Sequence, residues 1–228
     1  IAIIPARGGS KRIPKTNIID FQGKPLISWT IEAAIKSNIF SRVIVSTDDI
    51  EISDIAKQYG ASVPFLRKNN NDDHSTVSDV VLDVLEELNE DYDSVVMLMA
   101  NCPLRNSNDI KNSVNFFNNN KTSNFQLSSF KFGWMNPWWA FKLDALNHHD
   151  FLFPETTKSR SQDLDELYCP TGSIWMANSE AFKKARSFYG PHQQFYPINW
   201  VAAVDIDDEH DLQMANLISQ NQLDKTDG

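Results

Sequence analysis

Short, uninterrupted apolar runs recur along the chain and are separated by longer polar or amphipathic stretches. The first four runs lie at residues 1–5, 42–47, 61–67 and 94–100. Continuous apolar runs of this length are typical of strands that are buried on both faces, as in a parallel sheet. We therefore predict strands at these positions and further strands at residues 124–130, 172–177 and 200–206.

The stretches between these runs carry a helical pattern. Leu26, Ile27 and Ile31 recur at a spacing that places them on one helix face, and Pro25 suits a helix start. Ser75 or Thr76 is suited to cap the helix that follows it. We predict helices over residues 25–38, 48–60, 75–90, 106–120, 179–185 and 208–219.

Strands that alternate with helices at this spacing predict a single α/β domain over residues 1–228, with a mostly parallel sheet covered by helices on both faces. The stretch 131–170 breaks the alternation, and it contains Trp134, Trp138 and Trp139. We interpret it as an inserted segment with its own small apolar surface. In sheets of this kind the ligand lies past the carboxyl ends of the strands. Residues 6–17, 100–105 and 205–208 fall at such ends.

Bulk composition limits the classes of partner. The chain has 228 residues, a formal net charge of -9 and a pI near 5.0, so we expect no nucleic-acid partner, because nucleic-acid binders usually present a basic face. We also expect no membrane partner, since no apolar run approaches the roughly 20 residues that span a bilayer. Cys102 and Cys169 lie far apart without metal-ligand spacing, which favours the reducing cytoplasm.

A basic, glycine-containing loop follows the first apolar run. The sequence ARGGSKRIPKTN at residues 6–17 holds four cations and a Gly-Gly pair. The glycines allow positive φ and a close backbone approach to a ligand, and successive N–H groups can form an anion site. Arg7 and Lys11 could clamp phosphate oxygens. The alternative is a solvated turn, and the spacing matches neither common glycine-rich nucleotide motif.

Two carboxylates alternate at the end of the last predicted strand. Asp205 and Asp207 would face the same side of that strand. Two acids on one face favour a cation between them, and Mg²⁺ binds carboxylate and phosphate oxygens together. The alternative is that one of these acids, or Asp208, only caps the following helix.

A third candidate lies inside the inserted segment. Arg160 and Gln162, in the sequence RSQDLDELY, could bind a carboxylate or sugar hydroxyls, although charged loops are usually solvated. The five histidines show no metal-ligand spacing.

Taken together, these segments resemble one enzyme family. The sequences IPARGGSKRIPKTNI, GKPLISWTIEAA, VIVSTDD, YGASVPFLR, RSQDL and DIDDEHDL are similar to those of the nonulosonic acid cytidylyltransferases, which include the CMP-sialic acid synthetases. The resemblance implies a Rossmann-like fold and transfer of CMP from CTP to the anomeric hydroxyl of a nine-carbon keto-sugar acid, with release of pyrophosphate. It also implies a homodimer that exchanges contacts through segment 131–170.

The resemblance assigns roles to individual residues. Arg7, Lys11 and Asp207 would be catalytic, and Asp205 and Asp207 would hold Mg²⁺. The sugar acid would contact Asn101, Arg160 and Gln162. The nucleotide would contact Ala6, Arg7, Gly8, Gly9, Ser10, Lys11, Asn17, Arg67 and Ser78.

Four positions depart from the pattern of the sialic acid enzymes. Thr16 stands where the family often has Lys, and Met99 stands where those enzymes have Gln. Cys169 aligns with an Arg of those enzymes, and Trp139 lies near the position of a Lys. The last three of these places lie on the sugar side, so we expect a less hydroxylated, more heavily N-acylated sugar of the pseudaminic or legionaminic kind.

Two other functions remain open on the sequence. One is a nucleotidyltransferase for a different sugar, such as an octulosonic acid or a sugar phosphate. The other is a catalytically idle binding protein with the same fold, which the intact Arg7, Lys11, Asp205 and Asp207 disfavour.

Overall fold

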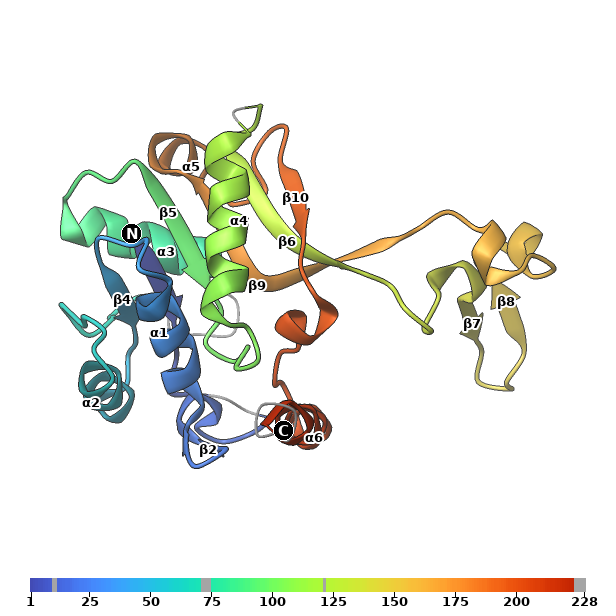
Figure 1. The fold of residues 1–228 in the computed structure, drawn as a ribbon, viewed down its shortest axis with the longest axis horizontal. Helices are drawn as coiled ribbons and strands as arrows, with labels where there is room; N and C mark the ends of the chain where they lie inside the picture. The colour runs from blue at the N-terminus through green and yellow to red at the C-terminus, as the bar shows by residue number, and fades with distance from the viewer. Residues whose placement is uncertain (10–11, 71–74, 121, 224–228) are drawn as a thin grey trace.

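A six-stranded sheet forms the centre of the molecule. The structure is a computed structural model, and it describes residues 1–9, 12–70, 75–120 and 122–223. The strand order is β10-β6-β9-β5-β1-β4 (Figure 1). Strand β1 pairs in parallel with β4 and β5, and β10 pairs in parallel with β6, whereas β9 runs antiparallel to both its neighbours. The strands are β1 (Ala2–Pro5), β4 (Val43–Ser46), β5 (Ser94–Leu98), β6 (Phe125–Lys131), β9 (Tyr168–Asn178) and β10 (Gln194–Pro197).

Helices cover both faces of this sheet, as predicted. Alternate residues of β1 point to opposite faces: Ile4 packs in a cluster with Ile31 of α1, while Ile3 packs in a cluster with Leu82 of α3. This alternation follows from the two-residue period of a strand. The helices are α1 (Leu26–Ser37), α2 (Ile50–Gln58), α3 (Val77–Leu88), α4 (Ser107–Asn119), α5 (Ser179–Ala185) and α6 (Glu209–Leu223).

The predicted helices are all present: α1 to α4 are shorter than predicted, α5 has the predicted bounds, and α6 extends further, to Leu223. Several of their starts have clear chemical causes. Pro25 is the N-cap residue of α1. Thr76, rather than Ser75, caps α3 in a reciprocal box with Asp79. Asp49 caps α2 by accepting from the backbone of Glu51 and Ile52.

Two predicted strands are wrong. Residues 61–67 form only an isolated bridge between Ser62 and Ile44, because Pro64 has no amide hydrogen to continue a ladder. Residues 200–206 begin with a 3₁₀ turn, Trp200–Ala203, whose start is capped by Asn199. The chain then runs without regular structure through Asp207. Conversely, β10 lies in a segment for which the sequence predicts no strand.

The inserted segment forms an arm that projects from the body (Figure 1). It leaves the sheet where β6 ends at Lys131 and returns where β9 begins at Tyr168. It carries the hairpin β7 (Phe141–Leu143) and β8 (His149–Phe151) and three 3₁₀ turns, Pro137–Trp139, Pro154–Thr156 and Ser161–Asp163. A short hairpin near the N-terminus, β2 (Asp20–Phe21) and β3 (Lys24–Pro25), and the turn Thr16–Ile18 complete the elements.

Candidate active site

A cavity opens at the carboxyl ends of β1 and β5, where the sequence predicts a ligand site. Its volume is about 300 Å³, and we call it the strand-end cavity. The loop after β1, the start of α3, the residues after β5 and the segment before α6 all contribute to its wall. The lining residues are Pro5, Ala6, Arg7, Arg12, Thr16, Asn17, Arg67, Asn70, Ser75, Val77, Val80, Met99, Ala100, Asn101, Ile206 and Asp207.

The loop after β1 is held in place by side chains. Nδ2 of Asn17 donates to the carbonyl oxygen of Arg7 at 3.0 Å. The amide of Gly8 donates to Oδ1 of Asp48 at 2.9 Å, so this N–H is not directed at a ligand. Neither Gly8 nor Gly9 has positive φ, contrary to the expectation of a glycine hinge. Gly8 is required for a different reason: a Cβ there would lie 2.6 Å from Oδ2 of Asp49.

Two predicted nucleotide contacts, Ser10 and Lys11, lie outside the described residues. The position before Asn17 is described. Thr16 is buried, lines the cavity and donates from Oγ1 to the carbonyl of Ile13 at 2.6 Å. Lys15 has left-handed backbone geometry, with φ of 56°, and pairs with Glu51 of α2. Lys15, the cation that precedes Thr16, is therefore directed toward α2.

The inner wall of the cavity is positively charged. Arg67 is only 7% exposed, and its Nη1 donates to the carbonyl of Ser46 at 3.3 Å. Burial lowers the pKa of the Arg67 guanidinium, and the positive charge of Arg7 lowers it further. Asp48 raises this pKa, because its Oδ1 lies 3.8 Å from Nη2 of Arg67. Two cations near each other on one wall favour an anionic ligand, because its charge offsets their mutual repulsion.

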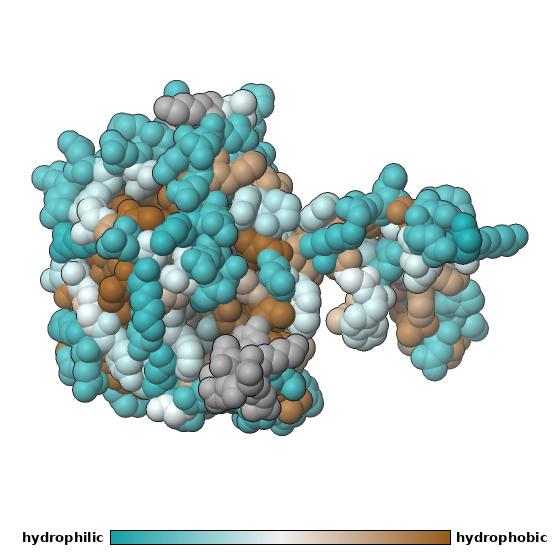
Figure 2. All heavy atoms as spheres, viewed as in Figure 1, coloured by the Kyte–Doolittle hydropathy of each residue, from teal (hydrophilic) through white to brown (hydrophobic). Residues whose placement is uncertain are grey.

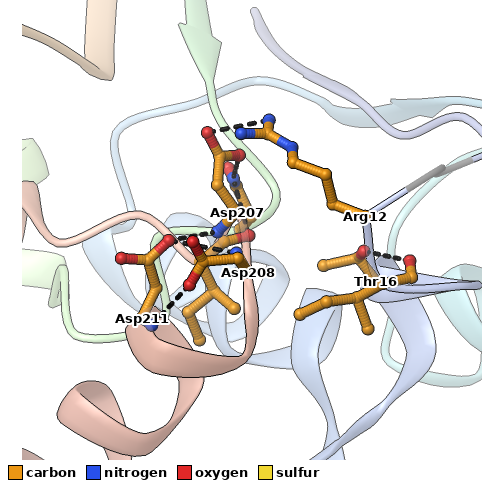
Figure 3. A network of polar contacts seen from close by, with 8 residues as sticks. Arg12, Thr16, Asp207, Asp208 and Asp211 are labelled. Atoms are coloured by element: carbon orange, nitrogen blue, oxygen red, sulfur yellow. Dashed lines mark hydrogen bonds and ion pairs between the residues drawn. The ribbon is translucent and has the colours of Figure 1, made fainter. Parts of the chain in front are cut away.

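Another part of the cavity wall carries a carboxylate, that of Asp207. Oδ2 of Asp207 lies 2.9 Å from Nη2 of Arg12 (Figure 3). Nδ2 of Asn101 donates to Oδ1 of Asp207 at 3.4 Å. The pKa of Asp205 is raised because surrounding atoms remove part of its hydration and because Asp207 lies nearby. The two carboxylates are therefore close together, although the segment is not the strand that the sequence predicts.

Asp208 has a different role from its two neighbours. Its Oδ1 accepts hydrogen bonds from the backbone amides of His210 and Asp211, in the first turn of α6. In return, Oδ2 of Asp211 accepts from the backbone amide of Asp208 (Figure 3). This is a capping box. The helix-cap alternative thus holds for Asp208, which leaves the side chains of Asp205 and Asp207 available for a ligand.

The donor set around Asp207 fits a hard divalent cation. Asp205 and Asp207 supply two carboxylates, and Oδ1 of Asn101 is a buried oxygen for which no hydrogen-bond donor is present among the described residues. Oxygen ligands of these types are those that Mg²⁺ prefers. The described part of the chain holds no group of three or more His, Cys, Asp or Glu residues that could bind a metal ion. Such a cation would need further ligands from phosphates or water.

Three predicted contacts lie away from the strand-end cavity of their own chain. Ser78 is buried in α3, where its Oγ accepts from the amide of Phe188 at 3.3 Å. Arg160 and Gln162 lie in the projecting arm, where Arg160 forms a two-point ion pair with Asp163 at 2.7 and 3.0 Å. The sequence interpretation left out Arg12, Asn70 and Ser75, which all line the cavity. Arg12 could have been found from its place in the basic loop.

Comparison with known proteins identifies the family. A family model described as cytidylyltransferase matches residues 1–224. The chain belongs to the cytidylyltransferase family. This cytidylyltransferase is 39% identical to the pseudaminic acid cytidylyltransferase of Campylobacter jejuni, over 96% of this chain and 95% of that protein. It is 34% identical to the CMP-N,N'-diacetyllegionaminic acid synthase of Legionella pneumophila, over 91% and 90% of the two chains.

More distant relatives extend the comparison. The cytidylyltransferase is 32% identical to the N-acylneuraminate cytidylyltransferase of Streptococcus agalactiae, over 92% of this chain and 51% of that protein. A solved structure of CMP-2-keto-3-deoxy-manno-octonic acid synthetase complexed with CTP has a TM-score of 0.73 at 15% identity, covering 97% and 98% of the two chains. These findings confirm the predicted nonulosonic acid cytidylyltransferase family and the α/β fold. Among the described residues, no helix of the cytidylyltransferase is long and apolar enough to cross a membrane.

Proposed function

We propose that this enzyme transfers CMP from CTP to the anomeric hydroxyl of pseudaminic acid. One observation carries the choice of sugar: identity falls from 39% with the pseudaminic acid enzyme to 34% with the legionaminic acid enzyme and 32% with the N-acylneuraminate enzyme. Met99 supports it, because an apolar side chain lines the cavity where the sialic acid enzymes have a Gln amide. An apolar wall tolerates a methyl or acylamino group in place of a hydroxyl.

In the proposed reaction the triphosphate of CTP lies against the positive wall formed by Arg7 and Arg67. The anomeric oxygen forms a bond to the α-phosphorus, and the bond from that phosphorus to the bridging oxygen breaks. Pyrophosphate leaves with the electron pair, and the hydroxyl proton passes to water. Fixed cations stabilise the charge that builds up on pyrophosphate. The Asn17 amide supports this by holding the backbone of Arg7.

Asp205 and Asp207 would hold the divalent cation, and the Asn101 amide donates to Asp207 beside it. When bound, Mg²⁺ would neutralise phosphate charge and help the attacking hydroxyl lose its proton. On the protein side, burial raises the pKa of Asp205, and the nearby charge of Asp207 adds to this shift. This repulsion favours binding of the metal together with CTP.

We further propose that the enzyme is a homodimer in which the arm reaches the partner. Trp134 is 87% exposed, and Met135, Phe141, Leu143 and Leu146 are exposed on the same arm. Figure 2 shows brown, hydrophobic groups among the hydrophilic surface of the projecting arm. Exposed apolar groups of this density usually mark an interface. Arg160, Gln162 and Trp139 also belong to the arm, so they would serve the sugar of a partner protomer. Cys169 lies where the arm rejoins the body.

The proposal also covers location and partner class. Cys102 and Cys169 are both free thiols, which suits the reducing cytoplasm. The substrates are CTP and a sugar acid, and we propose no nucleic-acid or membrane partner.

A substrate panel tests the proposed function. Pyrophosphate release is measured with CTP, UTP and GTP against pseudaminic, legionaminic, N-acetylneuraminic and octulosonic acids. We expect kcat/KM to be highest, by tenfold or more, for CTP with pseudaminic acid. Preference for N-acetylneuraminic acid would refute the sugar assignment, and preference for UTP or GTP would refute the nucleotide. No turnover with any pair would favour the binding-protein alternative.

A further inference from the structure

One arginine is completely buried beside the end of β5. Arg105 is only 1% exposed, and it does not line the strand-end cavity. Burial lowers the pKa of its guanidinium, against the smaller opposing effects of Cys102 and Asp109. Its Nε has no hydrogen-bond partner among the described residues. Burying a cation is costly, and apolar side chains often replace buried charges without loss of stability. Folding stability alone therefore does not explain this residue.

The guanidinium of Arg105 joins three separate elements. Nη1 donates to the carbonyl oxygen of Ser173 in β9. Nη2 donates to Oγ1 of Thr30 in α1 at 2.9 Å and to the carbonyl oxygen of Met99, the residue after β5, at 3.2 Å. A planar guanidinium fork can reach acceptors in several directions, whereas a Lys ammonium is a point charge. Arg105 therefore fixes the end of β5 relative to α1 and β9.

The segment that is fixed after β5 forms part of the cavity wall, since Met99 and Asn101 both line the cavity. The backbone amide of Ile206 donates to the carbonyl oxygen of Asn101 at 2.9 Å, and Nδ2 of Asn101 donates to the carbonyl oxygen of Ile206 at 3.2 Å. The same Nδ2 donates to Oδ1 of Asp207 at 3.4 Å. The position of Asn101 therefore helps to set that of Asp207.

A second line of contacts runs from Arg105 through Ser173. Oγ of Ser173 donates to the carbonyl oxygen of Ala202 at 2.8 Å. Ala202 belongs to the 3₁₀ turn that precedes Asp205. Arg105 thus holds both chain segments that meet at the carboxylate pair: it binds the segment after β5 directly and the segment before α6 through Ser173.

We propose that Arg105 is a positioning residue of cytidylyl transfer, which keeps Asn101 and Asp207 in the arrangement that binds the divalent cation. It acts through the backbone of these segments and touches no substrate. None of its acceptors belongs to the loops of Arg7 and Arg67, so the positive wall of the cavity does not depend on it. The inference rests on the proposed function, since it assumes CTP and a divalent cation, but it does not depend on which sugar accepts CMP.

Arg105→Met tests the proposal, because Met fills much of the same space without the fork. Mn²⁺ binding in the presence of CTP is measured by electron paramagnetic resonance, and CTP binding without metal is measured by calorimetry in EDTA. We expect Mn²⁺ to bind at least about tenfold more weakly and kcat in the complete assay to fall at least about tenfold, because small displacements of reacting groups are costly. CTP affinity without metal should stay within about twofold of the wild type, since the cations of the positive wall are unchanged. Arg105→Lys should behave in the same way, since it keeps the charge but not the fork.

A milder variant covers the case in which the Arg105 variants do not fold. Thr30→Val removes one acceptor of Nη2 at nearly constant volume and should weaken Mn²⁺ binding by about threefold. The matched control is Gln126→Met. Gln126 is buried in β6 of the same sheet, and its Nε2 donates to the carbonyl oxygen of Ser113 in α4 at 2.9 Å. This variant also removes a buried polar anchor, but one that does not hold the end of β5, so its Mn²⁺ affinity should match the wild type.

Wild-type Mn²⁺ affinity in either Arg105 variant, or in Thr30→Val, would overturn the proposal. A fall in metal-free CTP affinity as large as the fall in Mn²⁺ affinity, or an equal loss in Gln126→Met, would also overturn it, because either result would show a general loosening of the fold. A wild type that binds no Mn²⁺ in the presence of CTP would contradict it as well. If the wild type binds Mn²⁺ and CTP but transfers CMP to no nonulosonic acid, the proposed function fails while the Arg105 result still stands.

Discussion

Asp207→Asn separates the catalytic role of this residue from its structural one. The substitution removes the ion pair with Arg12, in which Asp207 is 42% exposed, and an exposed pair is worth at most about 1 kcal/mol. It also removes the charge of Asp207, which adds to burial in raising the pKa of Asp205. Loss of this repulsion stabilises the folded protein and so opposes the loss of the ion pair. The two effects partly cancel, so we expect the melting temperature to change by less than about 4 °C.

The effect on turnover should be far larger. Loss of a metal-binding carboxylate is expected to lower kcat/KM by about a hundredfold or more, which corresponds to about 2.7 kcal/mol of transition-state stabilisation. The assay is pyrophosphate release at limiting Mg²⁺, with thermal unfolding measured on the same preparation.

The adjacent residue provides the control. Asp208 caps α6 through the amides of His210 and Asp211, so Asp208→Ala should lower the melting temperature. Because Asp208 is a helix cap, activity below the melting range should stay within about threefold of the wild type. Near wild-type turnover of Asp207→Asn would refute the metal assignment, and equal loss of activity in both variants would show that the segment acts only through its fold.

Three further outcomes are expected from the structure. Trp134→Ser, combined with Leu146→Ser, should shift the enzyme from dimer to monomer by light scattering at micromolar concentration, and a monomeric wild type would defeat the dimer proposal. Burial raises the pKa of Cys102 to about 12, so a thiol reagent at pH 8 should leave it unmodified in the native protein and modify it only on unfolding, which fast native labelling of Cys102 would contradict. The Thr76 hydroxyl and backbone amide lower the pKa of Asp79, so the stability that its carboxylate contributes is present above its unfolded pKa, about 3.9, and is lost as the pH falls through the lower folded value. In urea unfolding, the stability of Asp79→Asn should therefore fall less steeply toward acid pH than that of the wild type, and an unchanged slope would contradict the capping box.

The sequence by itself determined the local elements and the location of the site. Apolar runs and helical spacing predicted every α-helix, because both signals arise from neighbouring residues. The strand-end rule placed Arg7 and Asn101 at one cavity, because β1 and β5 are parallel and their carboxyl ends meet at one edge of the sheet.

Only the tertiary structure decided what depends on distant partners. The strand predicted at 200–206 became a 3₁₀ turn and an irregular segment, since Asn199 caps the turn and Ile206 donates to the backbone of Asn101. Arg160 and Gln162 proved to lie on a projecting arm, away from the cavity of their own chain. The contact between Arg12 and Asp207 joins residues almost the whole chain apart, and the number of such pairings is too large for any local pattern to select one. Their juxtaposition follows from how the first loop and the start of α6 pack on the same edge of the sheet.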